Sequence, residues 1–160
     1  MRGDRRPFTV GVTGLRDLGD FDIEGLRSTI RAELEAWKRG HDTVRMLNSI
    51  AAGADQLCAG IAISLEYELV CPLPFAEYRD DFHGETLTGY DKLLSQAKDV
   101  LVVSDSADKD AVYLAAGRYV ADHCDVLLAV WDGRPQSSIC GTAAVVSYAK
   151  ELGKEIKVIG

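Results

Sequence analysis

The stretch Asp125-Val-Leu-Leu-Ala-Val-Trp-Asp-Gly133 decides the fold. Its apolar run, residues 126–131, is too short for a lone helix and is rich in strand formers, so it predicts a buried strand. After a short polar stretch the chain resumes at Gly141-Thr142, where we predict a helix that runs to about residue 152. A helix that opens with Gly-Thr presents unpaired N–H groups and a hydroxyl at the positive end of its dipole. Such a place suits phosphate or another anion.

The same order of strand, loop and helix recurs along the chain. We predict strands over residues 8–12, 43–47, 68–72, 100–104, 126–131 and 156–159, and helices over residues 23–38, 53–65, 84–98, 111–123 and 141–152. This alternation is typical of an α/β, Rossmann-like three-layer sandwich with a mainly parallel sheet. No repeat or linker divides the chain, so we expect a single domain over residues 1–160.

Composition limits the classes of partner. The chain has 160 residues, of which 47% are hydrophobic and 27% charged, as is ordinary for a globular protein. Its net charge of −7 argues against a protein that binds the DNA or RNA backbone, so we expect no nucleic acid as partner. No apolar run approaches the roughly 18 residues of a membrane span, and we expect no membrane partner. The four cysteines lack ligand spacing and no signal peptide precedes the first strand, which predicts buried, reduced thiols in a cytoplasmic protein.

Several common catalytic and cofactor motifs are absent from the sequence. No G-x-G-x-x-G follows the first predicted strand, and there is neither a G-x-x-x-x-G-K-[ST] loop nor a G-x-S-x-G elbow. The three histidines are scattered without ligand spacing. We therefore predict no metal site and no cofactor.

Three loops leave predicted strands with small residues, and such residues let a backbone approach a phosphate or a ribose. In parallel sheets, ligands bind beyond the carboxyl ends of the strands, near the point where strand order reverses. The candidate ligand-binding residues are Thr13, Gly14, Leu15 and Arg16 in the first loop, Ser49, Ala52, Gly53, Ala54 and Asp55 in the second, and Trp131, Asp132, Gly133, Gly141 and Thr142 in the third.

Charged residues in these loops suit particular parts of a nucleotide. A guanidinium such as that of Arg16 matches phosphate geometry, and Asp55 and Asp132 could accept hydrogen bonds from ribose hydroxyls. Phosphate would lie on the N–H groups around Gly141-Thr142 and Gly53-Ala54.

Each of these residues also has a purely structural interpretation that the sequence leaves open. Arg16 could pair with Asp17 or Asp20, and Asp55 could only complement a helix dipole. Trp131 is as compatible with the core at a sheet end as with stacking on a base. Small residues often serve only tight turns and helix packing.

The whole pattern resembles the SLOG superfamily, the Rossmann-like group named for SMF/DprA and LOG proteins. The resemblance rests on five blocks that span nearly the whole chain: Gly11-Val-Thr-Gly-Leu-Arg-Asp17, Ser49-Ile-Ala-Ala-Gly-Ala-Asp55, Pro72-Leu-Pro-Phe75, Cys124 to Gly133, and Cys140-Gly-Thr-Ala143. The best match is to the SLOG domains of bacterial conflict systems, which are thought to sense nucleotide-derived signals. LOG phosphoribohydrolases and nucleoside 2-deoxyribosyltransferases are more distantly similar.

The chain departs from these families at informative positions. Leu15 stands where similar proteins commonly have histidine, and Cys140 replaces the first glycine of a Gly-Gly-Thr loop. Both enzyme branches have a glutamate where this chain has Val145. A glycosyl-transfer site needs a carboxylate, which valine cannot supply. We therefore assign no catalytic residue and lean away from an enzyme.

The resemblance implies a bacterial binding module for a nucleotide or nucleotide-derived small molecule, in the role of a ligand sensor. It also implies a homo-oligomer and an effector protein as a further partner. One alternative is an N-glycosidase or phosphoribohydrolase that uses another carboxylate in or near the strand-end loops: Asp55, Glu77, Asp105, Asp108 or Asp132. The other alternative is an oligomerisation module with a vestigial pocket, paired through the small-residue helices 111–121 and 143–149.

Overall fold

A computed structural model describes residues 6–135 and 141–160 and confirms the predicted alternation of strands and helices. The strands are β1 (Phe8–Gly14), β2 (Val44–Leu47), β3 (Glu68–Leu73), β4 (Asp99–Val102), β5 (Val126–Val130) and β6 (Glu155–Ile159). The helices are α1 (Ile23–Arg39), α2 (Ala54–Ser64), α3 (Gly84–Ser95), α4 (Lys109–His123) and α5 (Thr142–Glu151), with a short 3₁₀ helix η1 (Tyr78–Asp81) that the sequence did not predict.

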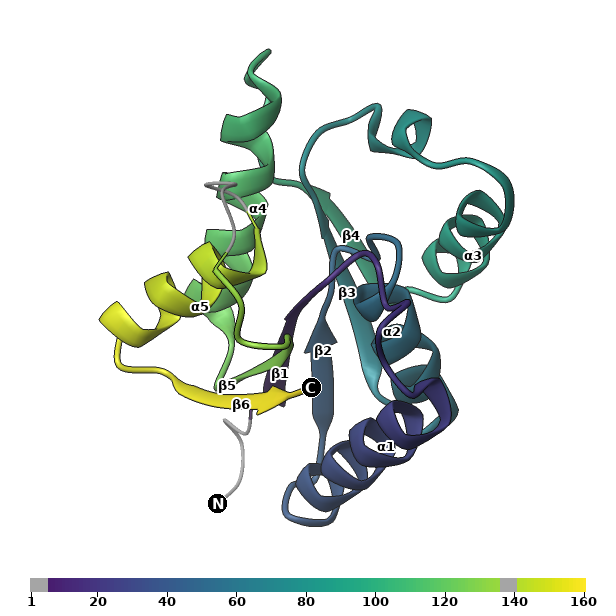
Figure 1. The fold of residues 1–160 in the computed structure, drawn as a ribbon, viewed down its shortest axis with the longest axis vertical. Coiled ribbons are helices and arrows are strands. Elements are labelled where there is room, and N and C mark those ends of the chain that lie inside the picture. Colours follow the sequence, from purple (N-terminus) through teal and green to yellow (C-terminus); the bar gives the residue numbers. More distant parts are fainter. Residues whose placement is uncertain (1–5, 136–140) are drawn as a thin grey trace.

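The six strands form one sheet in the order β4-β3-β2-β1-β5-β6, and every neighbouring pair is parallel (Figure 1). From β1 the chain adds β2, β3 and β4 on one side. Helix α4 then carries the chain back past β1, so that β5 and β6 are added on the other side. Strand order therefore reverses between β1 and β5, and this is the point where α/β sheets form ligand-binding crevices.

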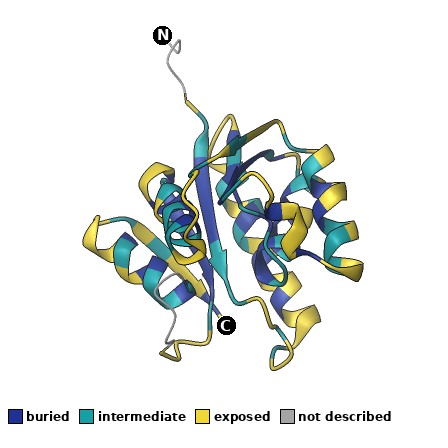
Figure 2. Ribbon diagram, turned by 90° about the horizontal axis from the view of Figure 1, so that it is seen from above, coloured by how far each residue is buried: buried dark blue, intermediate teal, exposed yellow. Residues whose placement is uncertain are grey.

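Two helical layers cover the sheet, with α1, α2 and α3 on one face and α4 and α5 on the other (Figure 1). All five residues of β5 are buried on both sides of the sheet. Val126 and Leu128 join the core beneath α1–α3, whereas Leu127 and Ala129 join the core beneath α4 and α5. This double burial explains why the stretch is continuously apolar rather than alternating. Exposed residues lie on the outer helix faces, in the loops and on the edge strands β4 and β6 (Figure 2).

Helix α1 packs against the sheet through its apolar stripe. Leu26, Ile30 and Leu34 are buried against the sheet, as the helical spacing predicted. Gly40 ends the helix and donates its N–H to carbonyls of the last turn. The backbone of Gly40 is right-handed, a conformation that any residue can adopt. The turn therefore does not require a glycine at this position.

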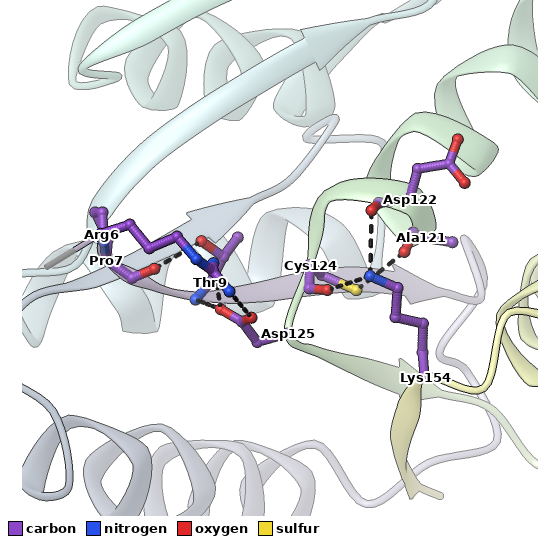
Figure 3. Close-up of polar contacts among 8 residues, drawn as sticks. All are labelled: Arg6, Pro7, Thr9, Ala121, Asp122, Cys124, Asp125 and Lys154. Atoms are coloured by element: carbon purple, nitrogen blue, oxygen red, sulfur yellow. Dashed lines mark hydrogen bonds and ion pairs between the residues drawn. The ribbon is translucent and has the colours of Figure 1, made fainter. Parts of the chain in front are cut away.

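Three charged side chains, Arg6, Asp125 and Lys154, hold the amino ends of the central strands (Figure 3). The Asp125 carboxylate accepts the N–H of Thr9 at 2.8 Å and pairs with the Arg6 guanidinium at 2.9 Å. Partial burial acts to raise the pKa of Asp125, but Arg6 and the Thr9 N–H hold it below its ordinary value. The Lys154 ammonium donates to the backbone carbonyls of Asp122 at 3.2 Å and Cys124 at 2.8 Å. These contacts join β1, β5 and the end of α4.

Cys58, Cys71 and Cys124 are free and buried, which confirms the prediction of unpaired thiols for those three. Cys140 lies outside the described residues. Across the described ranges, no helix is both long and apolar enough to cross a membrane.

Candidate functional site

A cleft of about 420 Å³ opens at the carboxyl end of β1, where strand order reverses. This volume falls in the range of about 300–1,000 Å³ that is usual for small-molecule sites. Its walls come from the loop after β1, the loop before α2, the segment before α3, and the facing sides of α4 and α5. They comprise Val12, Thr13, Gly14, Leu15, Arg16, Ser49, Ala51, Asp55, Pro74, Tyr78, Tyr113, Ala116, Gly117, Val120, Gly141, Thr142 and Val145.

The predicted loops after β1 and before α2 meet by direct backbone contact. A Cβ on Gly53 would lie 2.3 Å from the carbonyl oxygen of Arg16, and Gly53 has a φ of +81° that disfavours any side chain. A Cβ on Gly14 would lie 2.4 Å from that of Ala54. The Ala54 N–H donates to the Leu15 carbonyl at 3.0 Å. Both glycines are therefore needed to let these two loops touch.

This contact corrects one part of the predicted phosphate site. Ala52, Gly53 and Ala54 do not line the cleft, and the Ala54 N–H already has a backbone acceptor. The small residues of this loop serve packing against β1, which the sequence had left as an alternative to ligand contact. Ser49, Ala51 and Asp55 are the residues of this loop that face the cavity.

Asn48 shapes the loop before α2, although sequence reasoning did not select it. Its side chain is fully buried, donates to the Asp55 carbonyl at 2.8 Å and accepts the Ile50 N–H at 2.7 Å. Ile50 has a φ of +49°, an uncommon conformation for a β-branched residue. Asn48 thereby holds a strained turn that sets Ala51 and Asp55 at the cleft wall. The signal in the sequence was an asparagine directly after a predicted strand.

Asp55 is the one carboxylate among the five proposed by sequence that lines the cleft. It is only 8% exposed, and its Oδ2 accepts a long hydrogen bond of 3.3 Å from the Ala51 N–H. Burial raises the pKa of Asp55 to about 7, and the Ala51 N–H and the Arg16 charge only partly offset this effect. Near neutral pH this side chain is therefore divided between acid and carboxylate.

Arg16 lies at the mouth of the cleft, with its guanidinium carbon 5.1 Å from the centre of the Tyr113 ring. Its predicted alternative partner Asp17 instead accepts the Gly19 N–H at 2.9 Å. Among the ion pairs of residues 6–135 and 141–160, none includes Arg16. The guanidinium is thus oriented by an aromatic ring, and its charge acts on the carboxylates of Asp55 and Asp81 without a close ion pair to either.

The Tyr113 side chain comes from α4 and was missed by the sequence reasoning. Its hydroxyl donates to Asp81, which also accepts the Lys109 ammonium at 2.8 Å. Burial and the neighbouring Asp81 raise the pKa of Tyr113 to about 12. The rings of Phe75 and Tyr78 meet Tyr113 edge-on, with centroids 6.1 Å and 6.0 Å away. This aromatic group forms an apolar wall beside the Arg16 charge.

The beginning of α5 forms the opposite side of the cleft, as predicted for Gly141 and Thr142. Val145 follows on the same wall and packs closely against Gly117 of α4. The two residues are so close that a Cβ on Gly117 would lie 2.7 Å from Val145 Cγ2. The position that carries glutamate in the similar enzymes is therefore an apolar contact between two helices. The small residues of α4 and α5 contribute to this internal packing.

The predicted residues Trp131, Asp132 and Gly133 lie outside this cleft. The Trp131 indole donates to the Arg134 carbonyl at 3.0 Å, and its backbone N–H bonds to Ile159. Asp132 pairs with Arg134 at 3.4 Å and lines a separate cavity of about 630 Å³ between α1 and the end of β6. Of the third predicted loop, Gly141 and Thr142 therefore line the cleft, whereas Trp131, Asp132 and Gly133 do not, and a single site for all three loops stays a prediction.

The other proposed carboxylates also lie elsewhere. Asp108 accepts the Asp110 N–H and caps α4, and neither Glu77 nor Asp105 lines the cleft. Within the described part of the chain, no group of three or more His, Cys, Asp or Glu side chains could hold a metal ion.

No family model and no curated protein matches this sequence. Solved structures do match. DNA processing protein A (DprA) from Streptococcus pneumoniae is 18% identical, with a TM-score of 0.67 over 96% of this chain. The same protein from Helicobacter pylori is 16% identical, with a TM-score of 0.67 over 96% of this chain. The protein TM1055 is 14% identical, with a TM-score of 0.58 over 92% of this chain.

The chain shares the Rossmann-like α/β fold of these three structures. DprA is one of the proteins for which the SLOG group is named. The resemblance predicted from the sequence is thus confirmed at the level of the fold. The chain spans 50% of the S. pneumoniae structure, 66% of the H. pylori structure and 71% of TM1055.

These SLOG-fold structures correct the expectation that nucleic acid is excluded. The H. pylori structure is that of a protein with a single-stranded DNA binding mode. Excluding nucleic acid from the net charge was wrong, because net charge sums over the whole chain whereas strand binding depends on local charge. In this chain Arg6, Arg45 and Lys98 line one groove beside Tyr119 and His123, despite the overall charge of −7.

Proposed function

We propose that residues 1–160 form one domain that binds a nucleotide or nucleotide-derived anion in the cleft at the strand reversal. The observation that carries this proposal is that the Arg16 guanidinium and the amino-terminal end of α5 line the same cavity. A cation and a helix amino terminus both stabilise phosphate, and here they reinforce each other across one cleft.

The remaining walls suit the other parts of such a ligand. Phosphate would lie between Arg16 and Gly141-Thr142, and the half-buried ring of Tyr113 offers apolar surface for a base. Asp55, which lines the same cavity, would hydrogen-bond a ribose or a base. The lack of a carboxylate at Val145 supports binding without hydrolysis, and a role as a ligand sensor is the use that we propose for this module.

Isothermal titration calorimetry tests the proposal with AMP, ADP-ribose, NAD, a cyclic dinucleotide and a single-stranded oligodeoxythymidine. We expect Arg16→Ala to weaken binding of the preferred ligand by about 10- to 150-fold, the equivalent of losing about 1.5–3 kcal/mol from a charged hydrogen bond. Arg134→Ala is the matched control, because Arg134 lines the other cavity. Equal affinities for both variants, or binding of the oligonucleotide alone, would reject the proposal.

A second pair of variants tests the helix end. Gly141→Glu places a carboxylate at the proposed phosphate position and should abolish binding. Gly60→Glu adds the same charge on α2, where a new Cβ would meet no atom within 4 Å. Undiminished binding by the Gly141 variant would show that phosphate lies elsewhere.

Asp55 supports a second candidate, an N-glycosidase that acts on nucleoside monophosphates. It supplies the cleft with a carboxyl whose burial raises the pKa to about 7, as general acids require. Chromatography of AMP after incubation with the protein decides between the two functions. Free adenine that disappears in Asp55→Asn would establish the glycosidase, whereas intact AMP supports binding alone.

A further inference from the structure

Asp55 is the one acidic residue of the described chain that is buried. It lies behind the mouth of the cleft, at the first turn of α2, and is 8% exposed. Oδ2 accepts the Ala51 N–H, whereas Oδ1 has no protein partner among the described residues and is not a fully buried atom. Oδ1 is therefore the oxygen that a molecule in the cleft can reach.

Few charges act on this carboxyl. Arg16, from the loop after β1, is the one charged side chain that does so. Cys58 on the same helix, Cys71 on β3 and Tyr78 on η1 face it as neutral groups, because burial raises the pKa of each of them far above neutrality. The described side chains of α1, α3, α4 and α5 place no charge against it.

An anionic ligand would favour protonation of the Asp55 carboxyl in three ways. Its phosphate would neutralise Arg16, the charge that favours the carboxylate form. It would also bring negative charge near Oδ1 and shield that atom from solvent. All three effects favour the neutral carboxylic acid, whose hydroxyl can donate a hydrogen bond.

We propose that Asp55 is a specificity-determining residue of the cleft, which binds its anionic ligand as a neutral acid and donates a hydrogen bond from Oδ1 to an acceptor atom of that ligand. This inference rests on the proposed function and adds to it that ligand binding takes up a proton. The ligand must therefore present a hydrogen-bond acceptor, such as a base carbonyl, a ring nitrogen or a phosphate oxygen, beside Oδ1. A ligand with only a hydroxyl donor there gains nothing from the acid form.

The affinity for ADP-ribose between about pH 6 and pH 8.5 tests the proposal, because the pyrophosphate of this probe does not titrate in that range. With the carboxyl titrating near 7 in the free protein and staying protonated in the complex, the dissociation constant should rise about 30-fold across the range. Asp55→Asn is the matched variant, because its amide still accepts the Ala51 N–H and donates permanently toward the cleft. It should bind at about pH 8.5 as tightly as the wild type binds at about pH 6, with no pH dependence.

Carboxyl carbon NMR of the wild-type protein supplies an independent readout. The signal that is missing from Asp55→Asn should titrate near neutrality in the free protein and shift to higher pH with ADP-ribose bound. Binding of ADP-ribose with one dissociation constant at all pH values would overturn the inference and leave the proposed function intact. The same holds for an affinity that rises with pH, or for a variant that keeps the wild-type profile. No binding of ADP-ribose at any pH would overturn both for this ligand class.

Discussion

Replacing Asn48 by alanine tests the reasoning about the cleft most directly, because no ligand is needed. The substitution removes two short hydrogen bonds, to the Asp55 carbonyl at 2.8 Å and from the Ile50 N–H at 2.7 Å. Asn48 is fully buried, so the Ile50 N–H would be left without a partner, whereas the Asp55 carbonyl keeps its hydrogen bond within α2. The unsatisfied N–H costs about 1–3 kcal/mol and the lost bond to the Asp55 carbonyl about 0.5–1.5 kcal/mol, which gives a loss of about 1.5–4.5 kcal/mol in the free energy of unfolding.

The strained turn adds a second consequence. Ile50 keeps its φ of +49° only while the surroundings enforce it, and Asn48 supplies the contact to its N–H. In Asn48→Ala the turn should relax, move the Ala51 N–H away from Asp55 and weaken ligand binding as well as stability.

Urea denaturation followed by circular dichroism measures the effect, with Ser49→Ala as the control. Ser49 donates one hydrogen bond to the Pro72 carbonyl at 2.7 Å and is half-buried, so its loss should cost about 0.5–1.5 kcal/mol. A destabilisation by Asn48→Ala no larger than that of the control would refute the account of a loop held by a buried amide.

Three further predictions concern other contacts. Gly53→Ala forces a Cβ to within 2.3 Å of the Arg16 carbonyl oxygen at a φ of +81°. This variant should be destabilised by more than about 3 kcal/mol in the same urea assay. The control Gly60→Ala, on exposed helix surface, should be stabilised by up to about 1 kcal/mol. Asp125→Asn removes a carboxylate whose pKa is lowered, so the wild-type advantage, about 1–3 kcal/mol at neutral pH, should disappear as pH falls through the acid range; an advantage that persists in acid would contradict the pairing. Asp55 should have the opposite pH dependence, because its pKa is raised and the folded state binds more protons than the unfolded one between about pH 4 and 7. The free energy of unfolding should therefore fall as pH rises through this range. At about pH 8, Asp55→Asn should be more stable than wild type by at least about 1 kcal/mol.

The fold was predictable because its signals are local. Every predicted strand and helix is present, with ends displaced by no more than three residues. The unbroken apolar run of β5 indicated burial on both faces, and the spacing of Leu26, Ile30 and Leu34 indicated one helix face. These patterns follow from period and burial, which the sequence displays directly.

The site was predictable only in part, because its composition depends on distances between elements. Arg16, Asp55 and Thr142 were selected for the right loops, and they do line one cleft. Tyr113 was missed, since nothing local says which face of α4 approaches the end of β1. Asp132 lines another cavity, beside the end of β6, and the sequence does not show which cavity a residue after β5 faces. The nucleic-acid exclusion failed for a similar reason, as net charge says nothing of where charges lie.

The strand order also divides the cleft between two portions of the chain. Residues before β4 supply the walls at Arg16, Asp55 and Tyr78, and residues after it supply those at Tyr113 and Thr142. A cut in the exposed acidic loop 104–108 would leave one fragment with β1–β4 and another with β5 and β6, each carrying one side of the cavity. A ligand that contacts both sides would then act as the joint between two separately made pieces, and the chain could be converted into a split reporter of that ligand.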